Sequence, residues 1–449
     1  MTSADSGDMH DFLTEDEQVL RDISEWIGAR LSNRAAAPDP AVAVCVPGVS
    51  AEGVGTAAAW ASLRDAILPT SFPTDHPRYL AFVGGAPTPA AVLVDAAMSA
   101  AAVYGGSQLE AGAVVAAERA AIRWLCDVVG FPESAHGAFV SGGSTANLSA
   151  LVAARHGRQA PGGRPPGVIV VGGSAHSSVR SAADIMGCRV VVAGTAEAPL
   201  GAADLELVLE AVDVADVVAV VASAGATNTG AVDALDDIAA ACARRGIWLH
   251  VDAAYGGAAL LAPASRGLFR GIEQADSVTV DPHKWLFTPL DCAAVIYRDP
   301  DVARAAHRQS ASYLDATSIE GSDNPADYAV HLTRRARGVP LWASLVANGT
   351  DAYVDAVERC LETATYAAKC VDASADLELV TEPQLSVVLF RRRGWRAEDY
   401  ARWSQEAWGS GLALVTPTSF AGEVVLRLCF VNPLTSAADV DVILSSLED

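Results

Sequence analysis

Five short, continuous runs of apolar residues between positions 167 and 285 limit the folds open to this chain more than any other feature. They are rich in valine, and helical segments such as DALDDIAAACARRG (233–246) separate several of them. Strands that are apolar throughout are buried on both faces, and their alternation with helices is typical of a mostly parallel sheet. We therefore predict an α/β fold with a mostly parallel central sheet. The five runs are GVIVVGG, CRVVVAG, VVAVVASAG, IWLHVDAAYGG and DSVTVDPHKW.

The sequences on either side of this region have a different character. Residues 14–31 carry apolar side chains three and four positions apart, which predicts an amphipathic helix with Thr14 as its N-cap. Towards the C-terminus, LELVTEPQLSVVLFRRR and EVVLRLCFVNP predict strands of a smaller α+β unit. We therefore expect an N-terminal helical segment (1–75), a large α/β domain (76–335) and a small C-terminal α+β domain (336–449).

Charge and composition argue against several classes of function. The formal net charge of −23 repels nucleic-acid phosphates and anionic lipids, so we expect a small-molecule substrate and neither a nucleic-acid nor a membrane partner. No apolar run approaches the ~18 residues of a membrane span, and the acidic N-terminus does not resemble a secretion signal. The eight cysteines form no CxxC pair, and the nine histidines show no metal-ligand spacing. We therefore expect a cytoplasmic protein with reduced thiols and no metal site.

Chemically reactive side chains follow four of the predicted strands. Ligands of open α/β sheets bind at the carboxyl ends of the strands, so side chains at these positions are expected to meet. An imidazole, a hydroxyl, a carboxylate and an amine at one edge of a sheet indicate an active site. The residues, in chain order, are His176, Thr227, Asp252, and Asp281 with His283 and Lys284.

Two roles are open to Lys284. It could form a structural ion pair with Asp281 or Asp252, which is the usual role of a lysine close to acids. A desolvated lysine amine can instead be a nucleophile that forms a Schiff base with a carbonyl group. Its position at a strand end, among other reactive groups, favours the second role.

Pyridoxal phosphate forms such a Schiff base, and it needs three further groups besides the amine. Asp252 suits the acid that keeps the pyridine nitrogen protonated, with a strand-end turn residue as the alternative. His176 suits the flat group over the ring, although a lone histidine is more often an ordinary polar side chain. Gly143 and Ser144 suit the phosphate site, because free N–H groups at a helix start bind anions. Taken alone, that segment favours an ordinary Ser-capped helix.

Five sequence motifs resemble those of the group II pyridoxal-phosphate-dependent decarboxylases and occur in the same order as in that family. The family includes aromatic L-amino-acid decarboxylase, glutamate decarboxylase and bacterial relatives. The similarity runs from about residue 76 to the end. It implies the aspartate-aminotransferase type of α/β fold, fold type I, in an intertwined homodimer whose chains share the active sites. The motifs are GGSTANLSAL (142–151), AHSSV (175–179), HVDAAYGG (250–257), DPHKWL (281–286) and TRRARGVPLW (333–342).

The resemblance assigns a role to each matched position. It implies that Lys284 forms the Schiff base, that Asp252 pairs with the pyridine nitrogen, and that His176 stacks on the ring near the substrate carboxylate. It further implies cofactor contacts for Thr227, Ala254 and His283, and phosphate contacts for Gly143 and Ser144.

The resemblance also implies substrate contacts. Arg427 corresponds to an arginine that reaches the substrate carboxylate, with a rim ion pair as the alternative. Phe82, in AFVGG (81–85), falls where relatives line the side-chain pocket. A loop tyrosine usually protonates the α-carbon; Tyr328 is the nearest candidate, and Tyr313 and His331 lie in the same region.

One substitution departs from the family pattern. Many relatives have asparagine where this chain has Asp281. Because a carboxylate would repel the cofactor phosphate, we expect Asp281 to point away from it or to accept hydrogen bonds.

We therefore predict decarboxylation of an L-amino acid to the amine and carbon dioxide. Aromatic or medium aliphatic substrates are favoured over glutamate, because AFVGG offers no cation for a second carboxylate. Transamination, or decarboxylation coupled to oxidative deamination to an aldehyde, would use the same residues and remains the first alternative. A catalytically idle binding or regulatory relative is the second; the joint presence of Lys284, Asp252 and His176 argues against it.

Overall fold

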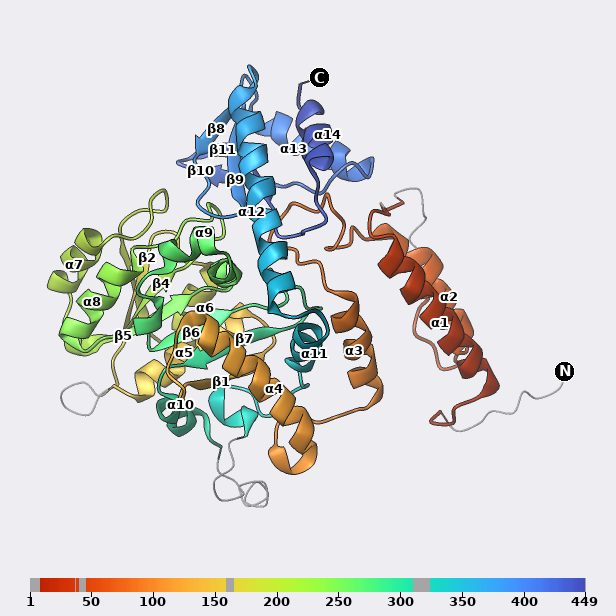
Figure 1. The fold of residues 1–449 in the computed structure, drawn as a ribbon, viewed down its shortest axis with the longest axis horizontal. Helices are drawn as coiled ribbons and strands as arrows, with labels where there is room; N and C mark the ends of the chain where they lie inside the picture. Colours follow the sequence, from red (N-terminus) through yellow and green to blue (C-terminus); the bar gives the residue numbers. More distant parts are fainter. Residues whose placement is uncertain (1–8, 37, 40–45, 159–164, 310–323, 449) are drawn as a thin grey trace.

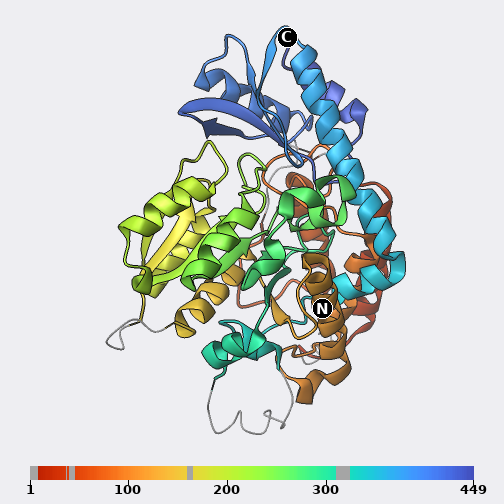
Figure 2. The same cartoon turned by 60° about the vertical axis from the view of Figure 1, so that its left-hand side comes forward.

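A seven-stranded sheet forms the centre of the larger part of the molecule (Figures 1 and 2). The structure is a computed structural model that describes residues 9–36, 38–39, 46–158, 165–309 and 324–448. The strand order is β1-β7-β6-β5-β4-β2-β3, and the neighbours from β3 to β6 pair in parallel. Only β7 runs against its neighbours β6 and β1, so the prediction of a mostly parallel sheet is confirmed. The strands are β1 (His136–Val140), β2 (Val168–Gly172), β3 (Arg189–Ala193), β4 (Val217–Ser223), β5 (Trp248–Asp252), β6 (Ser277–Val280) and β7 (Ala293–Tyr297).

Helices cover both faces of this sheet, which explains why its strands are apolar throughout. All seven residues of β4 are buried. Alternate residues serve different faces: Val170 packs in the cluster that contains α4 and α8, and Ile169 packs in the cluster that contains α5 and α6. The helices of this part are α3 (Pro89–Ala100), α4 (Gln108–Val129), α5 (Gly143–His156), α6 (Ser177–Met186), α7 (Ala202–Ala211), α8 (Leu235–Arg245), α9 (Pro263–Arg266), α10 (Pro300–His307) and α11 (Val339–Asn348).

A smaller antiparallel sheet lies above the first, and the long helix α12 (Thr350–Ala373) links the two parts (Figure 1). Its order is β10 (Pro417–Phe420), β11 (Glu423–Cys429), β9 (Val387–Arg392) and β8 (Leu377–Thr381), and it packs with α13 (Ala397–Gly409) and α14 (Ala437–Ser445). Helix α11 packs on α3 and α4, so it belongs with the larger part although it follows the expected boundary at 335. Leu80 conversely contacts the smaller part: its N–H donates to the carbonyl of Leu414 (2.9 Å), and its carbonyl accepts from the N–H of Cys429 in β11 (3.0 Å).

The N-terminal helices α1 (Thr14–Ser32) and α2 (Thr56–Ser62) pack on each other beside the main body (Figure 1). The rings of Trp26 and Trp60 meet edge to face at 5.8 Å. The prediction that Thr14 caps the first helix is wrong by one residue. The cap is Leu13, whose own N–H donates to the Asp16 carboxylate (2.8 Å) and whose side chain makes no capping hydrogen bond. Among the described helices, none is long and apolar enough to cross a membrane.

Candidate active site

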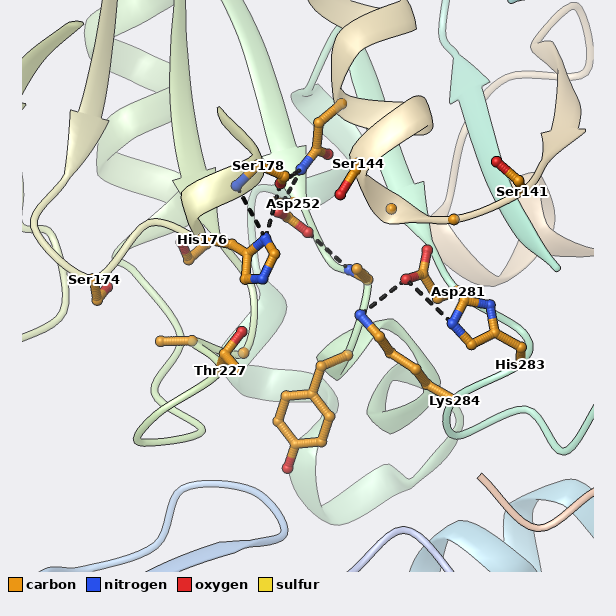
Figure 3. A pocket seen from close by; sticks show the side chains of 18 of the residues that line it. Ser141, Ser144, Ser174, His176, Ser178, Thr227, Asp252, Asp281, His283 and Lys284 are labelled. Carbon is orange, nitrogen blue, oxygen red and sulfur yellow. Dashed lines mark hydrogen bonds and ion pairs between the residues drawn. The ribbon is translucent and has the colours of Figure 1, made fainter. Parts of the chain in front are cut away.

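A cavity of about 350 Å³ opens where the strands of the larger sheet end. Eight predicted residues meet there, from the start of α5, the start of α6, and the segments after β4, β5 and β6 (Figure 3). The predicted convergence of strand ends is therefore present in the structure. These residues are Gly143, Ser144, His176, Thr227, Asp252, Ala254, His283 and Lys284.

Lys284 and Asp281 form an ion pair inside this cavity. The Lys284 Nζ lies 2.8 Å from Oδ2 of Asp281, whose side chain is 1% exposed. Burial by itself lowers the pKa of Lys284, but the charge and hydrogen bond of Asp281, with the charge of Asp252, outweigh it and raise the pKa overall. The lysine is therefore an ammonium group here, and it must lose a proton before it acts as a nucleophile.

Asp252 ends β5 and is held as a hydrogen-bond acceptor. One carboxylate oxygen accepts from Nδ2 of Asn147 (2.8 Å), and the other accepts from the N–H of Ala254 (3.1 Å). Both donors stabilise the ionised form of the carboxylate. The side chain is thus suited to hold a protonated ring nitrogen that enters the cavity.

The first turn of α5 supplies an anion site. The N–H groups of Thr145 and Ala146 bond back to the carbonyl of Gly142, which leaves those of Gly143 and Ser144 ahead of them at the helix start. The helix start is crowded on one side: a Cβ on Gly143 would lie 2.9 Å from Oδ2 of Asp281 and 3.3 Å from Cβ of Ala254. Glycine at 143 therefore keeps the space in which an anion can approach the helix.

Asp281 faces this anion site. Its Oδ2 accepts from Lys284, as expected, but the same oxygen would lie 2.9 Å from a Cβ placed on Gly143, so the carboxylate does not point away from the helix start. Its Oδ1 is buried without a partner among the described residues. The Asp281 carboxylate thus pairs with the Lys284 ammonium group and also places negative charge next to the start of α5.

His176 caps α6 and its ring points into the cavity (Figure 3). The Nδ1 atom accepts from the N–H of Ser178 (3.3 Å) and lies 2.9 Å from the Ser178 hydroxyl. His283 is fixed from the opposite side, because its Nδ1 lies 2.6 Å from the carbonyl of Cys292. Burial lowers the pKa of His283, despite the opposing charge of Asp281, so this ring is mainly neutral.

Arg427 and Phe82 lie next to the cavity rather than among the residues that line it. The Arg427 guanidinium donates to the carbonyls of Thr227 (Nε, 2.9 Å) and Phe82 (Nη1, 2.6 Å), and its Nη2 is buried without a partner among the described residues. The Phe82 side chain is 61% exposed, with a backbone φ of 51°. In this chain Phe82 therefore does not form a wall of the cavity.

The structure does not place Tyr328 at the cavity, which corrects its predicted role as the loop acid. Tyr328 is 1% exposed and packs in a hydrophobic cluster, where its ring meets that of His136 at 4.9 Å. A ring buried in the core cannot protonate a group in the cavity. His331 also lies outside the cavity lining, and Tyr313 falls outside the described residues.

Sequence reasoning missed several polar residues of the cavity. Asn147 and Ser178 lie in the motifs GGSTANLSAL and AHSSV, yet only the neighbours of each were assigned a role. Tyr255 stacks on the buried Trp285 at 5.5 Å, and its hydroxyl contacts Ser386 of the smaller part (2.5 Å). It thereby ties the cavity to the segment before β9.

Comparisons with known proteins identify the family of this chain. The family model described as the pyridoxal-dependent decarboxylase conserved domain matches residues 61–393. An aromatic-L-amino-acid decarboxylase of Bacillus atrophaeus is 32% identical over 381 residues, which cover 82% of this chain and 79% of the relative. An L-2,4-diaminobutyrate decarboxylase of Rhizobium meliloti is 31% identical over 409 residues, which cover 88% of this chain and 82% of the relative.

Solved structures show the same fold. A structure of Oryza sativa TDC with PLP and tryptamine superposes with a TM-score of 0.86 at 23% identity, covering 98% of each chain. Mouse CSAD in its apo form gives a TM-score of 0.84 at 25% identity, covering 97% of this chain and 99% of that one. Because the family model matches residues 61–393 and two decarboxylases are more than 30% identical over most of their length, the chain belongs to the pyridoxal-dependent decarboxylase family.

Proposed function

We propose that this protein decarboxylates an aromatic or medium aliphatic L-amino acid, with Lys284, Asp252 and His176 at the reacting centre. Membership of the family makes it a pyridoxal-phosphate-dependent amino-acid decarboxylase. The observation that carries the residue assignment is that an amine, a buried carboxylate acceptor and a helix start with free N–H groups line one cavity.

The residues present fit the cofactor. Pyridoxal phosphate supplies an aldehyde that bonds to amino groups and a ring that takes up the electron pair released with carbon dioxide. The N–H groups of Gly143 and Ser144 would hold the phosphate, and the Asp252 carboxylate would keep a proton on the ring nitrogen. Lys284 would provide the amine, and His176 would lie against the ring.

The substrate proposal depends on charge. Among the described residues that line the cavity, Lys284 is the only lysine or arginine, and it is already required for the cofactor. Arg427, whose Nε donates to the carbonyl of Thr227 and whose Nη2 has no partner among the described residues, is the group that would bind one substrate carboxylate. A second carboxylate would find no further cation among the described residues that line this cavity, which supports an uncharged substrate side chain.

The test is incubation of the cofactor-loaded protein with each standard L-amino acid, with products identified by mass spectrometry. We expect one amine to appear as its parent amino acid disappears. An aldehyde or a keto acid would instead establish the alternative reactions on the same residues. If no standard amino acid is consumed by protein that does bind the cofactor, the proposed substrate class is wrong.

Asp281 leads to a separate prediction about the cofactor. Its negative charge faces the phosphate site, so Asp281→Asn should strengthen binding of the phosphate group, by roughly tenfold. Titration of the variant and the parent protein with pyridoxal phosphate, and with pyridoxal, which lacks the phosphate, isolates this effect. The dissociation constant for pyridoxal, divided by that for pyridoxal phosphate, should be larger in the variant than in the parent protein. An unchanged or smaller ratio would contradict the proposed position of the phosphate.

The family resemblance also supports a homodimer, and the free thiols of the seven described cysteines support a reducing compartment such as the cytoplasm. Leu93 on α3 and Val346 on α11 are 54% and 68% exposed, and these two helices pack side by side. Exposed apolar side chains on adjoining helices are typical of an interface. Sedimentation velocity of the purified protein distinguishes a dimer from a monomer.

A further inference from the structure

A buried asparagine lies at the centre of a hydrogen-bond network behind the cavity. Asn147 is 1% exposed, and its Nδ2 donates to Oδ2 of Asp252 (2.8 Å) and to the hydroxyl of Ser178 (3.0 Å). Its Oδ1 accepts from the hydroxyl of Thr279 (2.9 Å) and lies 3.0 Å from Nε2 of His250. Both amide hydrogens and both carbonyl lone pairs are therefore in use.

The direction of each hydrogen bond follows from the charge on Asp252. An ionised carboxylate only accepts, so the amide nitrogen of Asn147 must face it and the amide oxygen must face His250. The Nε2 atom of His250 must then carry a hydrogen. Burial lowers the pKa of His250 to about 4, against the opposing charge of Asp252, so the ring is neutral and Nδ1 is left as an acceptor.

The far end of the network agrees with this assignment. His250 Nδ1 lies 2.9 Å from the hydroxyl of Ser277, and that hydroxyl accepts from the indole N–H of Trp248 (2.9 Å). Because Trp248 can only donate, Ser277 is free to donate its own hydrogen to His250. Every contact from Trp248 to Asp252 is thus satisfied by one tautomer of His250, the one with hydrogen on Nε2.

A second branch leads from Asn147 to His176. The Ser178 hydroxyl accepts from Asn147 and can donate to Nδ1 of His176, which also accepts from the Ser178 N–H. Nδ1 of His176 therefore carries no hydrogen. A neutral His176 consequently has its hydrogen on Nε2, and its ring points into the cavity (Figure 3).

We propose that His250, which does not line the cavity, is a positioning residue for the decarboxylation. Its Nε2–H holds the amide of Asn147 in the one orientation that donates to Asp252 and Ser178. This inference rests on the proposed role of Asp252 at the ring nitrogen. Without the His250 donor, Oδ1 of Asn147 keeps only the hydroxyl of Thr279 as a partner, so the amide is held less firmly in the orientation that donates to Asp252.

Two variants with side chains of similar volume distinguish the effect of the hydrogen-bond donor at position 250 from the effect of filling the same space. His250→Gln offers an amide N–H at a reach similar to that of Nε2, whereas His250→Met fills the site without a donor. We expect the dissociation constant for pyridoxal phosphate to stay within about threefold of the parent value for Gln and to rise roughly tenfold or more for Met. Equal binding by the two variants would overturn the proposal.

A measurement on the unmutated protein tests the inference even if neither variant folds. Neutron crystallography of deuterium-exchanged, cofactor-free protein locates the hydrogens directly. We expect deuterium on Nε2 of His250 and of His176, with the amide nitrogen of Asn147 towards Asp252. Deuterium on Nδ1 of His250 would overturn the proposal. Failure of the parent protein to bind pyridoxal phosphate would reject the proposed function instead, and the hydrogen positions would still be measurable.

Discussion

Replacing Lys284 by alanine is expected to reduce amino-acid turnover by roughly 10³-fold or more, because no other described amine lines the cavity. The side chain is 24% exposed and fills cavity space rather than core, so the variant should still fold. Turnover under saturating cofactor, with a far-ultraviolet circular dichroism spectrum, measures both effects.

The chain offers an unusually clean control for this experiment. It contains one other lysine, Lys369, which is exposed on α12 and away from the cavity. Lys369→Ala should keep parental turnover. Borohydride treatment of the loaded protein should attach the cofactor to the peptide that contains Lys284 and not to the one that contains Lys369. Attachment at Lys369, or near-normal turnover in Lys284→Ala, would show that the assignment is wrong.

The parts of the site that follow buried parallel strands could be predicted from the sequence. Continuous apolar runs identify such strands, and parallel strands bring their carboxyl ends to one edge of the sheet. This reasoning placed His176, Thr227, Asp252 and Lys284 together, and the structure has them around one cavity. It required no knowledge of how the helices pack, because the sheet alone sets the position of the strand ends.

Residues inside the network were harder to predict, although the sequence contained a signal. Residues two apart on a strand point to the same side, so His250 shares a face with Asp252, and Ser277 with Thr279. The register of β5 and β6 pairs His250 with Ser277 and Asp252 with Thr279. That register depends on the pairing of two strands, and a sequence read one strand at a time does not contain it.

Tyr328 shows a different limit. Its position before the TRRAR segment suggested an exposed loop, but the short 3-10 helix Pro325–Tyr328 packs against β1 and α10. The segment that precedes it, residues 310–323, contains Tyr313 and lies outside the described residues. Burial of a single ring in a short connection depends on tertiary packing, which local sequence patterns do not specify.

Asp252→Asn is expected to lower turnover by roughly 10²–10⁴-fold, because the change removes the charge that keeps a proton on the ring nitrogen while leaving the side-chain shape intact. The matched control is Asp233→Asn. Asp233 is also a buried carboxylate, which accepts from the N–H groups of Leu200 and Ser223 (both 2.7 Å) and does not line the cavity. In the Asn variant one of these two N–H groups no longer faces an acceptor oxygen. The variant should therefore lose about 1–3 kcal/mol of stability and keep its turnover number.

Thermal unfolding and turnover, measured on both variants with saturating cofactor, separate the two roles of a buried carboxylate. Both variants should lose stability, because each carboxylate accepts two hydrogen bonds, but only Asp252→Asn should also lose turnover. If Asp252→Asn loses stability but keeps its turnover number, Asp252 is a structural acceptor for Asn147 and the N–H of Ala254. The proton on the ring nitrogen would then have to be held by another group of the cavity.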